Sequence, residues 1–261
     1  MNKLLFAAMA LLAATTAAAG VRIETVTRDV KTKAANGDLQ VILVQDGKIR
    51  MNIPKNNNGM ILKNSIMYVL DDKKKTYMEM DKATMKKTAD QAGAAMKQMQ
   101  EQMAKMPPEQ RAQMEKMMGG NMPGMMSGKT DTWDVKNTGK TDTSEGRKCT
   151  IWTLNKNGKL HEELCVVPFS SLPGKEDFEK TFKELAESFA GMTDGLPGAG
   201  DSVKARNSIK GYPIRTRFFE PTGAERAMET VVMKWVEESI AGSNFEVPAG
   251  YKKREMPKMG E

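Results

Sequence analysis

A succession of short alternating segments with tight turns between them constrains this chain more than any other feature of its sequence. Between Lys48 and Ile53, apolar and polar residues alternate one by one, which is typical of a strand with one buried and one solvated face. The dipeptide Asp46-Gly47 before it favours a two-residue hairpin turn. Similar segments with local turns run through residues 20–80, so we expect an antiparallel meander there.

Strand-like segments return after residue 131 and continue to the end of the fold, and two helical patterns accompany them. The first helical pattern covers residues 81–106, and the second runs from Lys175 to Ala190 with its apolar residues on one face. A sheet that curls needs cover on its concave face, and two amphipathic helices are available as covers. We therefore predict an α+β fold, a curved antiparallel sheet that forms a half-barrel covered by amphipathic helices.

The first helical pattern is unusual because its apolar residues are methionine and alanine. About half of the 23 methionines lie between Met78 and Met126. Within residues 81–106, apolar residues recur at alternating steps of four and three: Met85, Ala89, Ala92, Met96, Met99, Met103 and Met106. Asp81 can cap this helix and Pro107-Pro108 ends it. Thioethers are flexible and polarizable, so such a seam suits a surface that adapts to an irregular guest.

A segment rich in Gly and Pro, residues 119–128, follows and carries Met122, Met125 and Met126. Its composition predicts a loop rather than regular structure. Methionine sulfur is a soft ligand for Cu(I), and a loop with three closely spaced thioethers can wrap such an ion. Histidine is absent nearby, and methionines at helical spacing more often pack than ligate. Copper binding by these three residues is therefore the alternative hypothesis.

The start of the chain is typical of a cleaved export signal. Lys3 supplies a positive charge, residues 4–14 form an apolar run, and Ala17-Ala18-Ala19 is a small-residue cleavage site. The run is too short to span a bilayer as a mature helix. We expect cleavage after Ala19 and a periplasmic protein. We further expect one domain over residues 20–253, with the Met-rich helical insertion 81–128 inside it, and a flexible C-terminal tail, residues 254–261.

The two cysteines, Cys149 and Cys165, lie in two strand-like segments joined by the turn sequence Asn155-Lys156-Asn157-Gly158. A three-residue loop at 156–158, with Gly158 left-handed, closes this hairpin. That register pairs Cys149 directly with Cys165, so that the two sulfur atoms face each other. In an oxidising compartment, this arrangement predicts a structural disulfide.

Charge and motifs argue against nucleic-acid binding and against catalysis. The formal net charge is +7, but basic residues are dispersed among acidic ones and aromatics are few, so no nucleic-acid face is expected. Lys73-Lys74-Lys75 is a tight basic run, a solvated turn or a weak contact for anionic lipid headgroups. The single histidine, His161, has no identifiable catalytic partner, and phosphate-loop and nucleophile-elbow motifs are absent. We expect a non-enzymatic protein without a cofactor.

Several sequence motifs resemble those of a known architecture. They are Gly47-Lys48-Ile49-Arg50-Met51, Met67-Tyr68-Val69-Leu70-Asp71, Lys75-Thr76-Tyr77, Met106-Pro107-Pro108-Glu109-Gln110-Arg111, residues 146–149, Gly211-Tyr212-Pro213 and Phe245-Glu246-Val247-Pro248-Ala249-Gly250-Tyr251. With them the chain resembles the LolA/LolB-like half-barrel of outer-membrane lipoprotein carriers. Over roughly residues 20–253 it is also similar to an uncharacterised exported bacterial family, a domain of unknown function thought to share that fold. The resemblance implies a fold and transfers no functional residue.

These observations lead to one main functional hypothesis. The protein binds a lipid, an acylated polypeptide or another apolar ligand between the curved sheet and the helix 81–106, without chemistry. The candidate lining residues are Met96, Met99, Met103 and Met106. A membrane surface or an acylated protein is a further partner that this hypothesis allows.

Overall fold

The computed structural model describes residues 19–37, 39–53, 58–107, 110, 131–193, 199–220 and 225–255. Its strands form one 12-stranded sheet. The strands of the first half are β1 (Ala19–Asp29), β2 (Gln40–Gln45), β3 (Lys48–Ile53), β4 (Asn58–Lys63), β5 (Ile66–Asp71) and β6 (Thr76–Met80). Those of the second half are β7 (Trp133–Ser144), β8 (Arg147–Lys156), β9 (Lys159–Val167), β10 (Tyr212–Phe219), β11 (Glu225–Ser239) and β12 (Lys252–Lys253).

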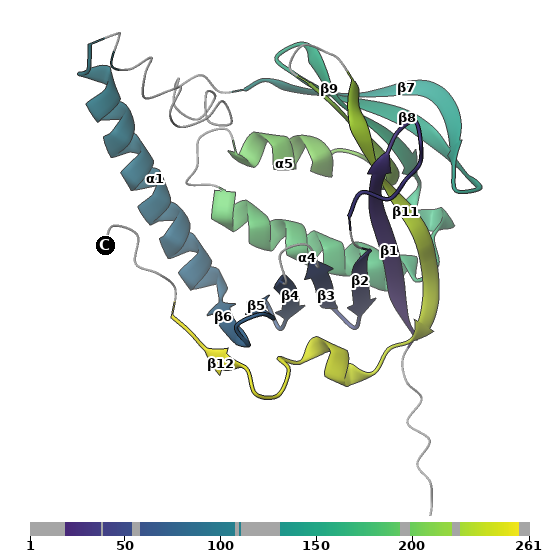
Figure 1. Ribbon diagram of the computed structural model, residues 1–261, viewed down its shortest axis with the longest axis horizontal. Helices are drawn as coiled ribbons and strands as arrows, with labels where there is room; N and C mark the ends of the chain where they lie inside the picture. Colours follow the sequence, from purple (N-terminus) through teal and green to yellow (C-terminus); the bar gives the residue numbers. More distant parts are fainter. Residues whose placement is uncertain are drawn as a thin grey trace, which may run out of the picture.

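Two meanders, β1–β6 and β7–β11, are joined into this single sheet by the pairing of β1 with β11 (Figure 1). The strand order is β12-β6-β5-β4-β3-β2-β1-β11-β10-β9-β8-β7. All pairs are antiparallel except that β12 runs parallel to β6, so the sheet is mixed. The β1–β11 pair extends from Ala19 opposite Ser239 to Asp29 opposite Met228, and it is the long-range contact on which the architecture depends.

Three α-helices accompany the sheet in the described part of the chain: α1 (Lys82–Ala104), α4 (Lys175–Thr193) and α5 (Ala199–Asn207). Short 3₁₀ turns lie at η2 (Phe169–Ser171) and η3 (Gly242–Phe245). As predicted, Asp81 caps α1, because its carboxylate accepts a hydrogen bond from the backbone N–H of Thr84 at 2.7 Å. None of the described helices combines the length and the apolarity that a membrane crossing would need.

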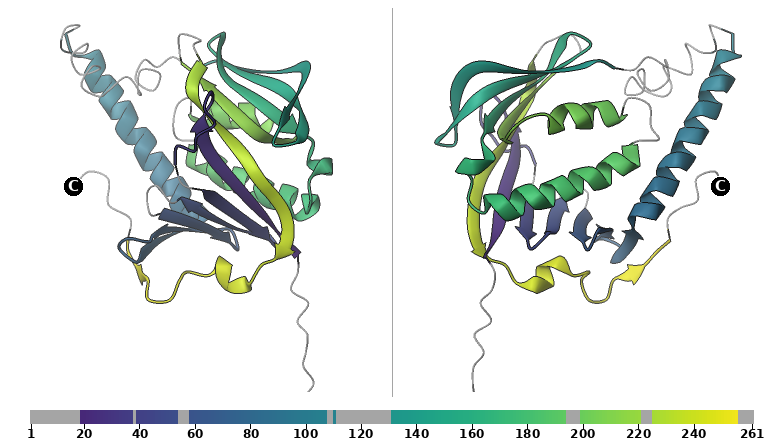
Figure 2. Two further views of the ribbon diagram at one scale, coloured as in Figure 1. Left: turned by 45° about the vertical axis from the view of Figure 1, so that its right-hand side comes forward. Right: turned by 180° about the vertical axis from the view of Figure 1, so that it is seen from behind.

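The prediction of an α+β half-barrel covered by amphipathic helices is wrong. The described residues form a large, open, mixed sheet that dominates the structure, and few helices accompany it. Helix α1 packs against α4 and against β6, at one end of the sheet, and does not cover its curved face (Figures 1 and 2). The periodicity of residues 81–106 indicated that one helix face is buried, but it could not identify the partner of that face.

Helix α4 is the element that lies against the sheet (Figure 2). Phe178, which is fully buried, stacks on Phe182 with ring centroids 4.1 Å apart and contacts Trp235 of β11 at 4.5 Å. Trp235 in turn donates its indole N–H to the carbonyl of Pro173, 3.0 Å away, just before the helix begins. Aromatic burial of this kind contributes several kcal/mol in total, on the order of 2 kcal/mol per buried ring, and fixes the start of the helix.

A second contact holds α4 at the turn between β2 and β3. The carboxylate of Asp177 accepts backbone N–H groups of Asp46 at 2.7 Å and of Gly47 at 3.2 Å. Both turn residues have positive φ, 50° and 71°, which is the conformation of the predicted two-residue hairpin. The turn therefore closes the hairpin and also anchors the helix.

The predicted disulfide between Cys149 and Cys165 is present, with a Cα–Cα distance of 5.3 Å. The predicted register is wrong. Lys156 lies opposite Lys159 across a two-residue Asn157-Gly158 turn, and a β-bulge at His161 then shifts the ladder so that Cys165 lies opposite Ile151. The disulfide therefore joins diagonal neighbours of β8 and β9 rather than directly opposed residues.

Candidate functional site

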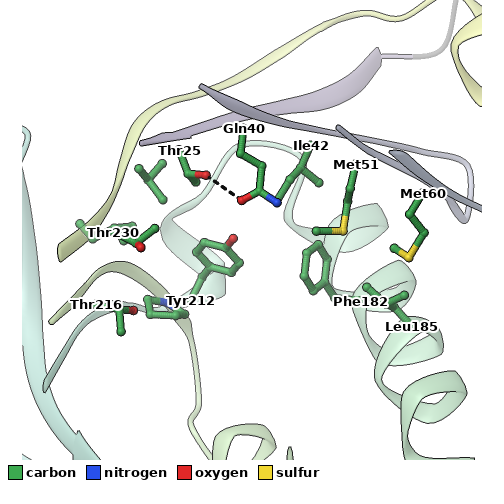
Figure 3. Close-up of a pocket in the computed structure, with 13 residues that line it drawn as sticks. Thr25, Gln40, Ile42, Met51, Met60, Phe182, Leu185, Tyr212, Thr216 and Thr230 are labelled. Carbon is green, nitrogen blue, oxygen red and sulfur yellow. Dashed lines mark hydrogen bonds between the residues drawn. The ribbon is translucent and has the colours of Figure 1, made fainter. Parts of the chain in front are cut away.

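A cavity of about 400 Å³ lies between α4 and the sheet. This volume falls within the usual range of small-molecule sites, roughly 300–1,000 Å³. Strands β1, β2, β3, β4, β10 and β11 and helix α4 all contribute to its wall, which is formed by Thr25, Gln40, Ile42, Met51, Met60, Phe182, Leu185, Tyr212, Pro213, Ile214, Thr216, Thr230 and Val232 (Figure 3). Because β1 and β11 supply the middle of this wall, the cavity exists only once the two meanders have paired.

One end of this cavity is apolar. The strand registers place Ile42 opposite Met51 and Met51 opposite Met60, so the three side chains form a row across β2, β3 and β4. Phe182 and Leu185 of α4 face this row from the other side (Figure 3). Two of the five side chains are thioethers, which can adapt their shape to a guest.

The other end carries neutral polar side chains. Thr25 lies opposite Gln40 on β1 and β2, and Thr216 lies opposite Thr230 on β10 and β11. The hydroxyl of Thr25 donates to the side-chain carbonyl of Gln40 at 3.3 Å. The hydroxyl of Tyr212 points into the cavity on the side of Gln40 (Figure 3). Burial raises the pKa of Tyr212 to about 12, so this hydroxyl stays protonated at neutral pH.

A second cavity, of about 670 Å³, adjoins the first and lies between α4, α5 and strands β9 and β10. The two share four wall residues: Phe182, Leu185, Tyr212 and Pro213. Unlike the first cavity, the second has charged residues in its wall, Glu179, Lys183 and Arg206. Arg206 forms an ion pair with Glu162, whose side chain is almost fully buried.

Of the four methionines predicted to line the ligand site, the three with described side chains, Met99, Met103 and Met106, do not line either cavity. Met103 is buried and Met99 and Met106 are half-buried on or just beyond α1. Met96 lies on α1, and its side chain is outside the described set. Earlier on the same seam, Met85 is buried in the main core. The seam of α1 is thus a packing surface in its first half, and its partner helix is α4.

The predicted copper ligands Met122, Met125 and Met126 lie outside the described residues. Copper binding by this segment stays a prediction of the sequence. Within the described part of the chain, no group of three or more His, Cys, Asp or Glu side chains could hold a metal ion. The predicted export signal up to residue 18 and the predicted tail from residue 256 also lie outside the described set.

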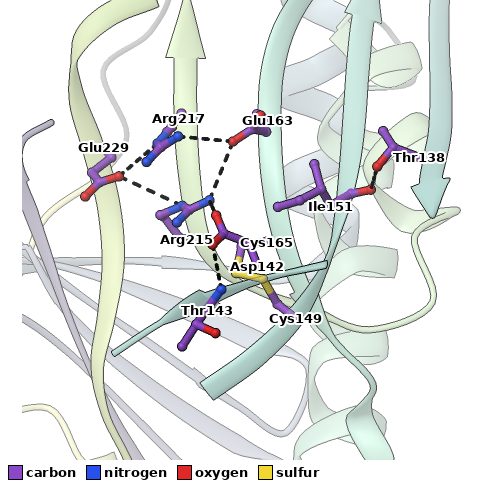
Figure 4. The surroundings of a disulfide bond; sticks show 10 residues. All are labelled: Thr138, Asp142, Thr143, Cys149, Ile151, Glu163, Cys165, Arg215, Arg217 and Glu229. Carbon is purple, nitrogen blue, oxygen red and sulfur yellow. Dashed lines mark hydrogen bonds and ion pairs between the residues drawn. A yellow bond between two sulfur atoms is a disulfide. The ribbon is translucent and has the colours of Figure 1, made fainter. Parts of the chain in front are cut away.

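The opposite face of the sheet carries a network of ion pairs centred on Glu229, and Figure 4 shows its contacts with Arg215 and Arg217. The side chain of Glu229 is 0% exposed. Its carboxylate binds Lys33 at 2.8 Å, Arg28 at 2.9 Å and Arg217 at 3.1 Å. Burial alone would raise the pKa of Glu229, but the hydrogen bonds from these three cations outweigh it and lower the pKa to about 2.

Further ion pairs complete this network beside the disulfide. Arg215, which is buried, binds Asp142 at 2.7 Å, and its hydrogen bond lowers the pKa of that carboxyl. Arg28 also binds Glu145 at 2.8 Å, and Arg217 lies 3.4 Å from Glu163. The four cations Arg28, Lys33, Arg215 and Arg217 therefore match the four anions Asp142, Glu145, Glu163 and Glu229. This balance indicates a structural network that joins four strands and the β7–β8 hairpin, not an ion-binding site.

Sequence reasoning missed the polar end of the cavity. Thr25, Gln40, Thr216 and Thr230 come from strands far apart in the chain, and each alone is an ordinary strand residue. The available signals were the apolar face of residues 175–190 and the alternation that points Met51 inward. Both indicated a buried surface on one element, and neither revealed that the two surfaces face each other.

Comparisons with known proteins do not identify a family for this chain. No protein-family model matches the chain, and no curated protein matches it. Among solved structures, an uncharacterized conserved protein from Thermus thermophilus has a TM-score of 0.42 at 7% identity, over 90% of both chains. PNGF-II, solved in two crystal forms, gives a TM-score of 0.34 at 8% identity, over 91% and 92% of this chain. The chain spans about a third (31% and 32%) of PNGF-II. Likenesses this weak support no assignment of fold family or function.

Proposed function

We propose that this protein binds an apolar or lipid-like small molecule in the cavity between α4 and the sheet, without catalysing a reaction on it. The observation that carries the proposal is the cavity itself. It has a volume of about 400 Å³, and its apolar end is formed by side chains from three strands and one helix. A site of this size with a mainly apolar wall and a few converging polar groups is typical of ligand-binding proteins.

The wall of this cavity also favours binding over chemistry. Among the described residues, its lining includes no Asp, Glu, His, Cys, Lys or Arg. The one titratable group in the described wall is Tyr212, whose pKa of about 12 is far from the neutral range in which a general acid or base is effective. A periplasmic location forms part of the proposal, and it is supported by the disulfide, since such bonds persist in oxidising compartments.

The proposal predicts that filling the cavity abolishes ligand binding. Met51→Trp adds an indole to the apolar end and is expected to weaken binding of the uncharged fluorophore N-phenyl-1-naphthylamine by about tenfold or more, because one lost anchoring contact of about 1.4 kcal/mol already gives tenfold. Fluorescence titration of the purified mature protein measures this affinity, and circular dichroism verifies that the variant folds.

Two matched variants locate the site. Ala186→Trp fills only the second cavity, and Met99→Leu alters the seam of α1 that the sequence had indicated. Both are expected to bind the fluorophore within about twofold of the natural protein, since neither residue lines the first cavity. If the Met99 variant loses binding, the ligand site lies on α1, as the sequence predicted, and not in the first cavity. If the natural protein binds no fluorophore and releases no lipid on solvent extraction, the proposed function is wrong.

A further inference from the structure

The polarity of the cavity wall restricts the chemical class of its ligand. All 13 described lining residues are neutral, and the polar ones are three threonines, one glutamine and one tyrosine. An isolated carboxylate or phosphate that left water for this site would lose its hydration without gaining a cation. That transfer costs several kcal/mol even after relaxation of the surroundings. The wall therefore disfavours an anionic headgroup inside the cavity.

The neutral polar groups are gathered at one end by the strand registers. Thr216 and Thr230 face each other across β10 and β11, and Thr25 and Gln40 face each other across β1 and β2. These four strands are consecutive in the sheet, in the order β2-β1-β11-β10. The apolar row continues from β2 through β3 to β4. The wall thus changes from polar to apolar along the sheet, and a ligand with one polar end fits it in one direction.

The polar end also retains unused hydrogen-bonding capacity. The side-chain carbonyl of Gln40 accepts from Thr25 at 3.3 Å. Among the described residues, neither the amide nitrogen of Gln40 nor the hydroxyl of Tyr212 has a hydrogen-bond partner in the protein. An amide NH₂ supplies two donors, and a protonated tyrosine hydroxyl can donate and accept. Together they match a hydroxyl, ester or amide group on a ligand.

The charged side chains nearby belong to the second cavity. Lys183 and Arg206 line it, and Arg206 is already paired with Glu162. Neither residue lines the first cavity, although the two cavities share Phe182, Leu185, Tyr212 and Pro213. A headgroup inside the first cavity therefore meets only neutral partners.

We infer that the ligand of the first cavity is an uncharged amphiphile. Its apolar body lies against Met51, Met60 and Phe182, and its neutral polar group faces Tyr212 and Gln40. Fatty alcohols, fatty esters and monoacylglycerol-like lipids belong to this class, whereas fatty acids and phospholipid headgroups do not. This inference rests on the proposed function and names the ligand class of the same site.

A matched pair of ligands tests whether the ligand is uncharged. 1-Dodecanol and dodecanoate share a twelve-carbon chain and differ in the charge of the polar end. Displacement of N-phenyl-1-naphthylamine from the natural protein at pH 8 gives the affinity of each, at concentrations below micelle formation. We expect the alcohol to bind about tenfold or more tightly than the acid, because the acid must neutralise or lose its hydration on entry.

Two substitutions test the orientation. Tyr212→Phe removes one hydroxyl while it keeps the buried ring, so the fold is preserved. It is expected to weaken dodecanol about threefold to tenfold, the effect of one neutral hydrogen bond, and to leave dodecane unchanged. Gln40→Lys adds a cation at the polar end and is expected to raise the affinity for dodecanoate to at least that for dodecanol.

The outcomes of these experiments distinguish failure of the inferred ligand class from failure of the proposed function. If the fluorophore binds but dodecanoate displaces it as well as dodecanol does, the uncharged class is wrong and apolar binding stands. Equal loss of dodecanol and dodecane affinity in Tyr212→Phe would overturn the orientation. If neither the fluorophore nor any of the three twelve-carbon compounds binds, the proposed function itself fails.

Discussion

Replacing Glu229 with glutamine is expected to lower the free energy of unfolding by about 3 kcal/mol. The substitution keeps the shape of the side chain and removes the one fully buried charge that Lys33, Arg28 and Arg217 share. Removing one member of a buried ion pair costs about 3–5 kcal/mol, because the remaining charges lose their partner. We expect a cost at the lower end of this range, because Arg28 still pairs with Glu145 and Arg217 still pairs with Glu163.

Urea unfolding at pH 7 measures this loss, and Glu238→Gln is the control on the same strand. Glu238 lies 3.6 Å from Arg22, and both side chains are roughly one-third exposed, at 37% and 32%. Such a surface pair contributes about 0–1 kcal/mol, so the control is expected to unfold almost as the natural protein does. Equal destabilisation by the two substitutions would show that burial of Glu229 has no special role.

The stabilisation by Glu229 is also expected to depend on pH. Its pKa falls from 4.5 in the unfolded chain to about 2 in the folded protein. A lowered folded-state pKa means that the contribution is complete above about pH 4.5 and is lost as the pH falls toward about 2. Between pH 5 and pH 3, the free energy of unfolding of the natural protein should therefore fall more steeply than that of Glu229→Gln. Parallel pH profiles for the two proteins would contradict this assignment.

Loss of the disulfide is expected to lower the free energy of unfolding by a similar amount, about 3 kcal/mol. Cys149 and Cys165 are 16 residues apart, and a closed loop of about this length restricts the unfolded chain by roughly that free energy. Both cysteines are buried, at 5% and 1% exposure, so the replacement should be alanine, which adds no unpaired hydroxyl.

The natural protein and the double variant Cys149→Ala/Cys165→Ala are compared with and without reductant. The natural protein should unfold at a lower urea concentration once it is reduced, and the urea dependence of its unfolding free energy should increase because the unfolded chain is less constrained. The double variant should not respond to reductant. An identical urea midpoint for the oxidised and reduced natural protein would mean that the bond contributes nothing to stability.

Features of the fold that depend on residues close together in the chain were predicted correctly from the sequence. Strand β3 (Lys48–Ile53) has the predicted bounds, and Asp81 caps α1 as expected. In each case the signal lies within a few residues, as an alternation or a capping side chain. The disulfide belongs to the same group, because the observed register differs from the predicted one by two residues, which leaves both cysteines on the same face and 5.3 Å apart at their Cα atoms.

Features that depend on bulges were not predictable in this way. The two-residue Asn157-Gly158 turn and the bulge at His161 together moved Cys165 from the position opposite Cys149 to the position opposite Ile151. On β11 the pairing with β1 shifts between Thr25 and Glu24, and Met233 is left 42% exposed although Val231 and Trp235 are buried. A bulge reverses which residues face each side, and strict alternation cannot reveal where it occurs.

The sequence alone determined strands such as β3, the Asp81 cap of α1 and the disulfide, because each is encoded by neighbours along the chain. Only the tertiary structure decided the architecture and the candidate site. The pairing of β1 with β11 joins two meanders into one open sheet, and α4 rather than the methionine-rich α1 lies over the cavity. The physical reason is that periodicity identifies a surface to be buried but carries no information about its partner, which long-range packing selects.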